Sequence, residues 1–300
     1  MANGRRTGVS DVITKAYLDS LLLEVRHLDA CLPDTTLEIY GKTFKTPITT
    51  AALSHMSKNC ADGMVKMAKG AHLAGAIAFS GMGAKEELEG MIAAGASVIK
   101  IIKPYKDRDS VYDKIRHAEK AGAFAVGIDI DHAFSRGRGY DEIEGMEMRP
   151  LQLHELCDMV KATKLPFIIK GVLSIRDAEK CLEAGVQGMV ISHHNGRLDY
   201  SVPPLMILPE IQKRTMGRIP LFVDCGLESG IDVFKALLLG ATACSIGRPL
   251  IPRLKEQGEE GVRDVILEMT KDLEYAMAMT STKSLKDMDS SVVHFGNFTW

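Results

Sequence analysis

A short pattern recurs along this chain: a helical stretch, then a glycine with small neighbours, then a brief apolar run. The glycines at its centre are Gly75, Gly95, Gly122, Gly185 and Gly240. A glycine just past a helix adopts the left-handed backbone conformation, which closes the helix at little steric cost. The run that follows is too short for a helix and too apolar for a half-exposed strand. The pattern therefore predicts strands that are buried on both faces of a parallel sheet.

Eight apolar runs fit this description, and a helical pattern follows each one. The predicted strands are Pro47–Leu53, Ala76–Ser80, Ser97–Ile102, Phe124–Ile130, Pro166–Lys170, Gly188–Ser192, Pro220–Asp224 and Ala243–Ile246. The predicted helices are Asp62–Ala74, Lys85–Ala94, Ser110–Ala121, Leu151–Thr163, Ile175–Ala184, Pro204–Thr215, Gly230–Leu239 and Gly261–Thr280. Ser174 and Ser110 stand where N-cap residues are expected.

Eight strand–helix units in 300 residues predict an α/β fold, a (β/α)8 TIM barrel over residues 47–300. Two domains of ~150 residues would also fit this length, but α/β barrels commonly form one domain of about 200–250 residues. A doubly wound open sheet is the structural alternative, although it usually has fewer strands. Residues 1–46 are predicted to form a short N-terminal helical extension, with one helix near Val12–Arg26.

Charge and composition exclude several classes of partner. Lys and Arg total 37 against 39 Asp and Glu, which leaves no bulk positive charge to hold nucleic acid or an anionic membrane. No apolar run reaches the ~18–20 residues of a membrane helix, and no apolar segment follows Arg5 and Arg6 as in a secretory signal. The six cysteines form no CxxC pair, which predicts free thiols in a reducing compartment. We therefore expect a cytoplasmic protein with a small-molecule substrate and no nucleic-acid or membrane partner.

Polar residues follow the last four predicted strands, at the end of the barrel where such enzymes carry out their chemistry. Two of these segments are glycine turns that lead into helices, one containing Asp224 and Gly226 and the other Gly247 and Arg248. Such turns present backbone N–H groups and a positive dipole end to an anion, and an arginine adds a charge-assisted pair. Together they predict a phosphate site. The alternative is that the glycines only shape tight turns.

The other two segments contain Lys170 and, further along, His194 and Arg197. The lysine could form a Schiff base, stabilise negative charge on a cofactor, or pair with Asp129 or Asp224. A histidine with a pKa near neutrality can accept a proton, and an arginine can clamp a carboxylate. His193 is interpreted as structural. His55 and His132 each follow a predicted strand and could reach the pocket, although an isolated histidine is more often a satisfied surface or core group. No set of His, Asp and Glu has the sequence spacing of metal ligands.

The connection from Asp131 to Pro150 is unusually long and follows the fourth predicted strand. It is polar and carries glycine and arginine. Long connections on this side of a barrel are often lids over the active site. The alternative is a flexible surface excursion, and the sequence leaves both open.

Several linked segments resemble the FMN-dependent α-hydroxy acid dehydrogenase/oxidase family over roughly residues 40–290. They are Ile168–Leu173, Ser192–Asp199, Asp224–Leu237 and Ile246–Pro249. The sequence departs from the family pattern at Ile101, Lys103, Gly127 and Glu228. Glu228 stands where the family has a phosphate-binding arginine, and Lys103 stands where it has a substrate-binding tyrosine.

The resemblance implies a role for each matching residue. His194 would take the substrate hydroxyl proton, with Asp129 beside it, and Lys170 would stabilise the anionic reduced flavin. Arg197, together with Lys103, would bind the substrate. The residues implied in FMN binding are Ala51, Ala52, Ser80, Lys170, Asp224, Gly226, Gly247 and Arg248.

The implied activity is the oxidation of a 2-hydroxy acid or a related hydroxylated substrate, with hydride transfer to flavin N5 and a histidine base. An FMN-dependent isomerase similar to type 2 isopentenyl-diphosphate isomerase is one alternative. A non-catalytic barrel that binds a phosphorylated ligand is another. The resemblance also implies a homotetramer.

Overall fold

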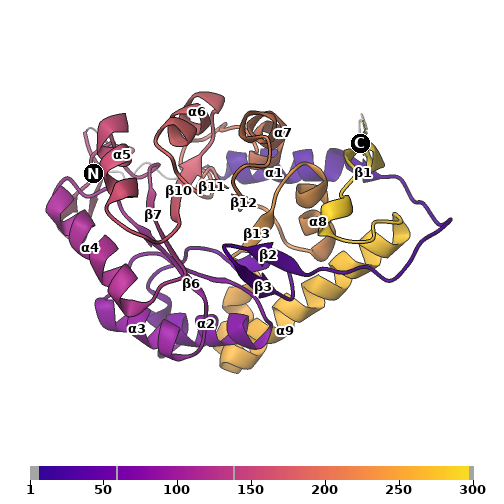
Figure 1. Ribbon diagram of the computed structural model, residues 1–300, viewed down its shortest axis with the longest axis horizontal. Coiled ribbons are helices and arrows are strands. Elements are labelled where there is room, and N and C mark those ends of the chain that lie inside the picture. Colours follow the sequence, from indigo (N-terminus) through magenta and orange to yellow (C-terminus); the bar gives the residue numbers. More distant parts are fainter. Residues whose placement is uncertain (1–6, 59, 138, 297–300) are drawn as a thin grey trace.

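Eight parallel strands form one sheet in the order β4-β13-β12-β11-β10-β7-β6-β5 in the structure, a computed structural model that describes residues 7–296 except 59 and 138. Each overlaps its predicted run. The strands are β4 (Ile48–Thr50), β5 (Ala78–Ser80), β6 (Val98–Ile102), β7 (Ala125–Asp129), β10 (Phe167–Val172), β11 (Gly188–Ile191), β12 (Leu221–Val223) and β13 (Ala243–Ile246). The order follows the chain without reversal, so the sheet is the predicted TIM barrel and not a doubly wound sheet (Figure 1).

The barrel closes between its first two strands. The Thr50 N–H donates to the Ile77 carbonyl at 3.2 Å, and the Phe79 N–H donates to Thr50 Oγ1 at 2.9 Å. Inside, the rings of Phe79 and Phe222 meet edge-on with their centroids 5.3 Å apart, and both side chains are buried. Because apolar side chains fill the interior, the polar groups gather at the carboxyl ends of the strands.

Eight helices surround the barrel in the described part of the chain (Figure 1). They are α2 (Gly63–Leu73), α3 (Lys85–Ala93), α4 (Arg108–Ala121), α5 (Leu153–Lys161), α6 (Ile175–Glu183), α7 (Pro204–Thr215), α8 (Gly230–Leu238) and α9 (Leu250–Met279). The five glycines of the recurring pattern all have positive φ, between +72° and +106°, as predicted. No helix among the described residues has the length and apolar character needed to span a bilayer.

Two predicted helix starts have different outcomes. Ser174 caps α6, because its side chain accepts a hydrogen bond from the Asp177 N–H. The prediction for Ser110 was wrong: α4 begins earlier, and the Asp107 carboxylate accepts from the N–H groups of Asp109 and Ser110. Aspartate and serine are equally good N-cap residues, and Asp107 is the residue that caps α4.

The residues before the barrel contact both of its ends. The predicted helix near Val12–Arg26 is instead α1 (Val9–Ser20), and the chain then continues as strand β1 (Leu21–Leu23), which pairs with β14 (Val293–Phe295) near the C-terminus. The hairpin of β2 (Leu37–Ile39) and β3 (Lys42–Phe44) packs its apolar face on the barrel interior at the ends where the strands begin. α1 lies at the opposite end, where the Thr14 hydroxyl is 2.8 Å from Nε2 of His193.

The long connection after β7 has structure of its own. It contains the short hairpin of β8 (Glu142–Ile143) and β9 (Met146–Glu147). The rings of Phe134 and Tyr140 stack with centroids 5.5 Å apart, and the Arg149 guanidinium lies 3.3 Å from the Tyr140 ring centroid. Arg136 pairs with Asp199 of the segment after β11 at 3.2 Å. These contacts attach the connection to the carboxyl-terminal end of the barrel.

The packing inside the barrel gives a test of the fold. Replacing Phe79→Ala removes one ring of the buried pair and should lower the free energy of unfolding by about 3–5 kcal/mol. Tyr275→Ala on α9 is the matched control, since that side chain is exposed and its loss should change stability by no more than about 0.5 kcal/mol. Urea unfolding measures both, and equal midpoints for the two variants would contradict the proposed interior.

Candidate active site

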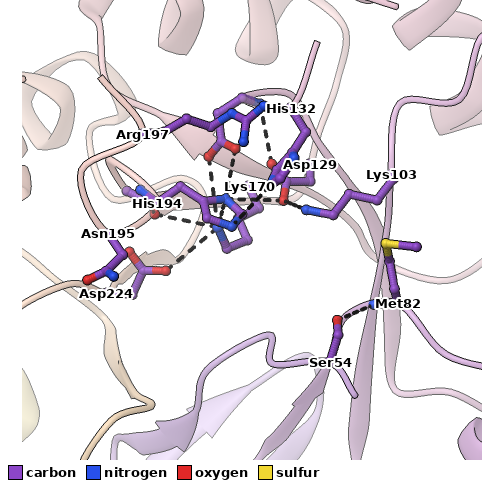
Figure 2. Close-up of polar contacts among 12 residues, drawn as sticks. Ser54, Met82, Lys103, Asp129, His132, Lys170, His194, Asn195, Arg197 and Asp224 are labelled. Atoms are coloured by element: carbon purple, nitrogen blue, oxygen red, sulfur yellow. Dashed lines mark hydrogen bonds and ion pairs between the residues drawn. The ribbon is translucent and has the colours of Figure 1, made fainter. Parts of the chain in front are cut away.

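Lys170 lies in β10, two residues before the strand ends, and only 6% of its side chain is exposed. Its ammonium group lies 3.8 Å from Asp224 Oδ2, 3.9 Å from Asp131 Oδ2 and 3.3 Å from Nδ1 of His194 (Figure 2). Burial alone would lower the pKa of Lys170, but Asp129, Asp224 and Asp131 outweigh it and raise that pKa. The predicted pairing with Asp224 is therefore present, and the amine is held as a cation.

Asp129, at the end of β7, is the most deeply buried charge of this cluster. It lies beside Lys170 in the sheet and accepts a hydrogen bond from the Lys103 ammonium at 2.7 Å. Its burial would raise the pKa of the carboxyl, but Lys170 and Lys103 hold it well below its usual range. Asp129 is thus a fixed anion between two lysines.

His194 projects from the segment after β11, where its own φ of +50° is in the left-handed region. Its Nδ1 lies 2.8 Å from Asp131 Oδ1 and 3.5 Å from Asp129 Oδ2. Burial, and next the charge of Lys170, lower the pKa of His194 to about 3. The imidazole is therefore neutral at pH 7 and able to accept a proton.

Asp131 and His132 were not predicted as site residues. The sequence signal was their place directly after β7, but an isolated histidine is more often structural. Burial, and next the negative charge of Asp129, raise the pKa of Asp131 to about 7. His132 Nε2 lies 3.2 Å from Nε2 of His194, and its Nδ1 lies 3.1 Å from Asp141 Oδ2. Both residues belong to the long connection, which therefore contributes to the site.

Arg197 also contacts this connection. Its guanidinium pairs with the carboxylate of Asp141 and donates to the Phe134 carbonyl at 2.8 Å. The predicted substrate-binding arginine thus already holds one carboxylate. His193 is buried, and its Nδ1 accepts from the Gly196 N–H at 3.0 Å, which agrees with its predicted structural role.

A cavity of about 320 Å³ lies between these groups and the two glycine turns. Gly226 has a φ of +80°, which favours glycine there. Arg248 is half-exposed on the cavity wall, 3.4 Å from Asp11 of α1, and Glu228 is exposed. The predicted residues that line the cavity are Ala51, Ala52, Lys170, His194, Asp224, Gly226, Gly247 and Arg248.

Four predicted site residues are not among those lining this cavity in the described part of the chain: Ser80, Lys103, Asp129 and Arg197. The Ser80 hydroxyl accepts from the buried Lys100 ammonium at 3.2 Å. Asp129 pairs with Lys103, lies beside Lys170 in the sheet, and is 3.5 Å from Nδ1 of His194. Arg197 faces a second cavity of about 840 Å³ beneath the long connection, which Asp131 and Asp141 also line.

Donor atoms of Asp129, Asp131, His132 and His194 lie within 4.8 Å of one another, close enough to ligate one metal ion. Sequence spacing did not indicate this set, because its members come from two segments that only the fold brings together. Lys103 and Lys170 already neutralise the carboxylates of this cluster. We assign no metal to it.

The parallel barrel places two glycine turns, a lysine and a neutral histidine around one cavity, an arrangement typical of enzymes that bind a phosphorylated cofactor. The sequence pattern of FMN-dependent dehydrogenases matches residues 2–160 and 148–295. Glycolate oxidase of Spinacia oleracea is 30% identical, over 88% of this chain and 81% of its own length. Glycolate oxidase 1 of Oryza sativa subsp. japonica is 28% identical, over 89% and 82%.

A solved structure agrees with these matches. A mandelate oxidase variant with (S)-mandelic acid superposes with a TM-score of 0.89 at 27% identity, over 99% of this chain and 93% of that one. The chain belongs to the family of FMN-dependent dehydrogenases. The prediction of an FMN-dependent oxidoreductase is therefore confirmed, and it is favoured over the isomerase and binding-module alternatives.

The position of Asp131 predicts a pH effect on stability. Its raised pKa means that the folded protein binds this proton more tightly than the unfolded chain, whose aspartate pKa is 3.8. The stabilising contribution is present below about pH 4 and is lost as the pH rises through about 7. Asp131→Asn stays neutral throughout, so its stability relative to the unchanged protein should increase between pH 5 and pH 8. Urea unfolding at both pH values measures this, and a constant difference would argue against it.

Proposed function

We propose that this enzyme oxidises a 2-hydroxy acid and that the residues lining the 320 Å³ cavity hold its FMN. The observation that carries the proposal is that Lys170 and His194 line the same cavity as the two glycine turns. A phosphate in those turns would therefore leave the rest of the cofactor beside a cation and a base. Relatives named glycolate oxidase and a mandelate oxidase structure support this substrate class.

The residues present fit FMN. Gly226, Gly247 and Arg248 would hold the phosphate, and Asp224 lies between them and Lys170. Ala51, which lies beside Gly247, and Ala52 have small side chains that leave room for a flat ring. Glu228 also lines this cavity, but it is exposed, so its carboxylate can turn into solvent when a phosphate binds. FMN, when bound, accepts the hydride that leaves the substrate's hydroxyl-bearing carbon.

The charge of each site residue indicates its role in the proposed reaction. His194 is neutral and would take the hydroxyl proton as the carbon is oxidised. Lys170 keeps its positive charge and would stabilise negative charge that develops on the ring. Asp129 fixes Lys170 and Lys103 and faces His194, so it would orient the base.

Arg197 would bind the substrate carboxylate, since a guanidinium matches a carboxylate with two parallel hydrogen bonds. Asp141 occupies this arginine in the structure. A substrate carboxylate must therefore share or replace the Asp141 contact. The Lys103 ammonium pairs with Asp129 at 2.7 Å and adds a second positive charge to the proposed substrate site.

The proposal also covers the cellular location and the oligomeric state. All six cysteines are unpaired, which supports a reducing, cytoplasmic location. We keep the homotetramer as the proposed assembly on the strength of the family resemblance.

The cofactor gives the first test. The purified protein, or the protein mixed with FMN, should show the two visible absorption bands of an oxidised flavin. Anaerobic addition of glycolate, lactate or mandelate should bleach the band near 450 nm for at least one of them. A protein that takes up no FMN would refute the proposal, and bound FMN that none of the three bleaches would refute the substrate class.

His194→Ala separates binding from chemistry. This variant should keep its FMN but lose flavin reduction by about 100-fold or more, because general-base catalysis is worth roughly 10²–10⁴-fold. His154→Ala, on the exposed face of α5, is the matched control and should reduce its flavin at the unchanged rate. Anaerobic stopped-flow absorbance measures both. Full activity of His194→Ala would remove this residue from its proposed role.

A further inference from the structure

Two imidazoles meet on the wall of the cofactor cavity. His132 and His194 have their Nε2 atoms 3.2 Å apart, with ring centroids 4.4 Å apart and an interplanar angle of 71° (Figure 2). Both side chains line the cavity. Such a contact needs a proton on one Nε2 and a lone pair on the other.

Asp141 determines which ring carries that proton. Burial would raise the pKa of this carboxyl, but Arg197 and His132 outweigh it and lower it, so Asp141 is ionised and can only accept. Its Oδ2 lies 3.1 Å from Nδ1 of His132. The proton of neutral His132 is therefore on Nδ1, and its Nε2 presents a lone pair to His194. A carboxylate that orients an imidazole in this way is the usual support of a base.

The surroundings of His194 disfavour the protonated form of its imidazole. A ring that has accepted the substrate's proton is a cation, and the Lys170 ammonium lies 3.3 Å from its Nδ1. Lys103 adds a second positive charge through the same cluster. FMN and substrate would fill the open side of the cavity, which closes the direct route to water. The proton therefore needs another acceptor.

We propose that His132, oriented by Asp141, receives the substrate's proton from His194. This rests on the proposed function. In the step, His194 takes the substrate's proton on Nδ1, because its Nε2 already carries a proton toward His132; its Nε2–H bond then breaks and an Nε2–H bond forms on His132, so His194 returns to a neutral state. The Nδ1–H bond of His132 breaks in turn, and the Asp141 carboxylate takes that proton and releases it into the second cavity. His132 acts through His194, and it is a positioning and relay residue of the oxidation.

The two cavities support this route. His132 lines the cofactor cavity, whereas Asp141 lines the second cavity of about 840 Å³ beneath the long connection. The Asp141–His132 pair thus crosses the wall between them. The titratable and charged groups facing His132 are Asp141, Arg197, His194, Lys103 directly after β6 and Asp129 of β7. Burial, and next Lys103, lower the pKa of His132 to about 4, which favours passing the proton on over keeping it.

The test uses the FMN-loaded enzyme and whichever of glycolate, lactate and mandelate reduces the unchanged protein fastest. In anaerobic stopped-flow experiments, His132→Ala and His132→Gln should reduce the flavin about 10- to 100-fold more slowly, with a substrate Kd within about 3-fold of the unchanged value. Added imidazole should restore His132→Ala, because it can take up the missing relay position. Tyr140→Ala is the matched control, since it loosens the same connection without removing a base.

Three results would overturn the inference. The first is flavin reduction within two-fold of normal in His132→Gln. The second is a slow His132→Ala that imidazole does not restore. The third, which decides the matter if His132→Ala does not fold, is a solvent deuterium isotope effect in His132→Gln no larger than in the unchanged enzyme. If the unchanged enzyme itself is not reduced by any hydroxy acid, the proposed function has failed, and the inference falls with it.

Discussion

The buried ammonium of Lys170 is the charge around which the rest of the site is arranged. Removing an ammonium from water costs several kcal/mol, so it is stable only where carboxylates surround it. Asp129 and Asp131 supply them from the end of the neighbouring strand β7, and Asp224 supplies one from the end of β12. The same arrangement keeps His194 neutral, because a second cation next to Lys170 is unfavourable. One buried charge thus determines both the cation and the base that the chemistry requires.

The connection after β7 joins this cluster to solvent. Its first residues, Asp131 and His132, contact His194, and its later residue Asp141 binds Arg197. The sequence left open whether this segment is a lid or a surface excursion. Its ion pairs show that it is part of the site wall, so any movement of it must break contacts to Arg197 and His194. Substrate entry and the protonation of the base are therefore linked through one segment.

Much of the fold follows from local signals, whereas the site depends on distant contacts. The strands were predictable because buried parallel strands and helix-ending glycines such as Gly75 leave a pattern within about 30 residues. Lys170, His194 and Arg248 could be predicted because each lies in the last residues of a predicted strand or shortly after one. The contacts of Asp141 could not be predicted, because they depend on how the 20-residue connection from Asp131 to Pro150 folds back over the barrel. His132 was underestimated for the same reason: its partners are His194 and Asp141, and neither is adjacent in sequence.

Lys103 departs from the family pattern, and nearby carboxyl groups compensate its charge electrostatically. Lys103 stands where the family has a neutral tyrosine, which adds a positive charge to a site that already holds Lys170. Asp129 alone cannot balance both lysines, and Asp224 and Asp131 contribute further carboxyls 3.8 Å and 3.9 Å from Lys170. Because the pKa of Asp131 is raised to about 7, this carboxyl can gain or lose a proton near neutral pH, which changes the charge of the cluster by one. Lys103 should therefore be considered together with Asp129 and Asp131, because the lysine without these carboxyls would leave an unbalanced charge beside His194.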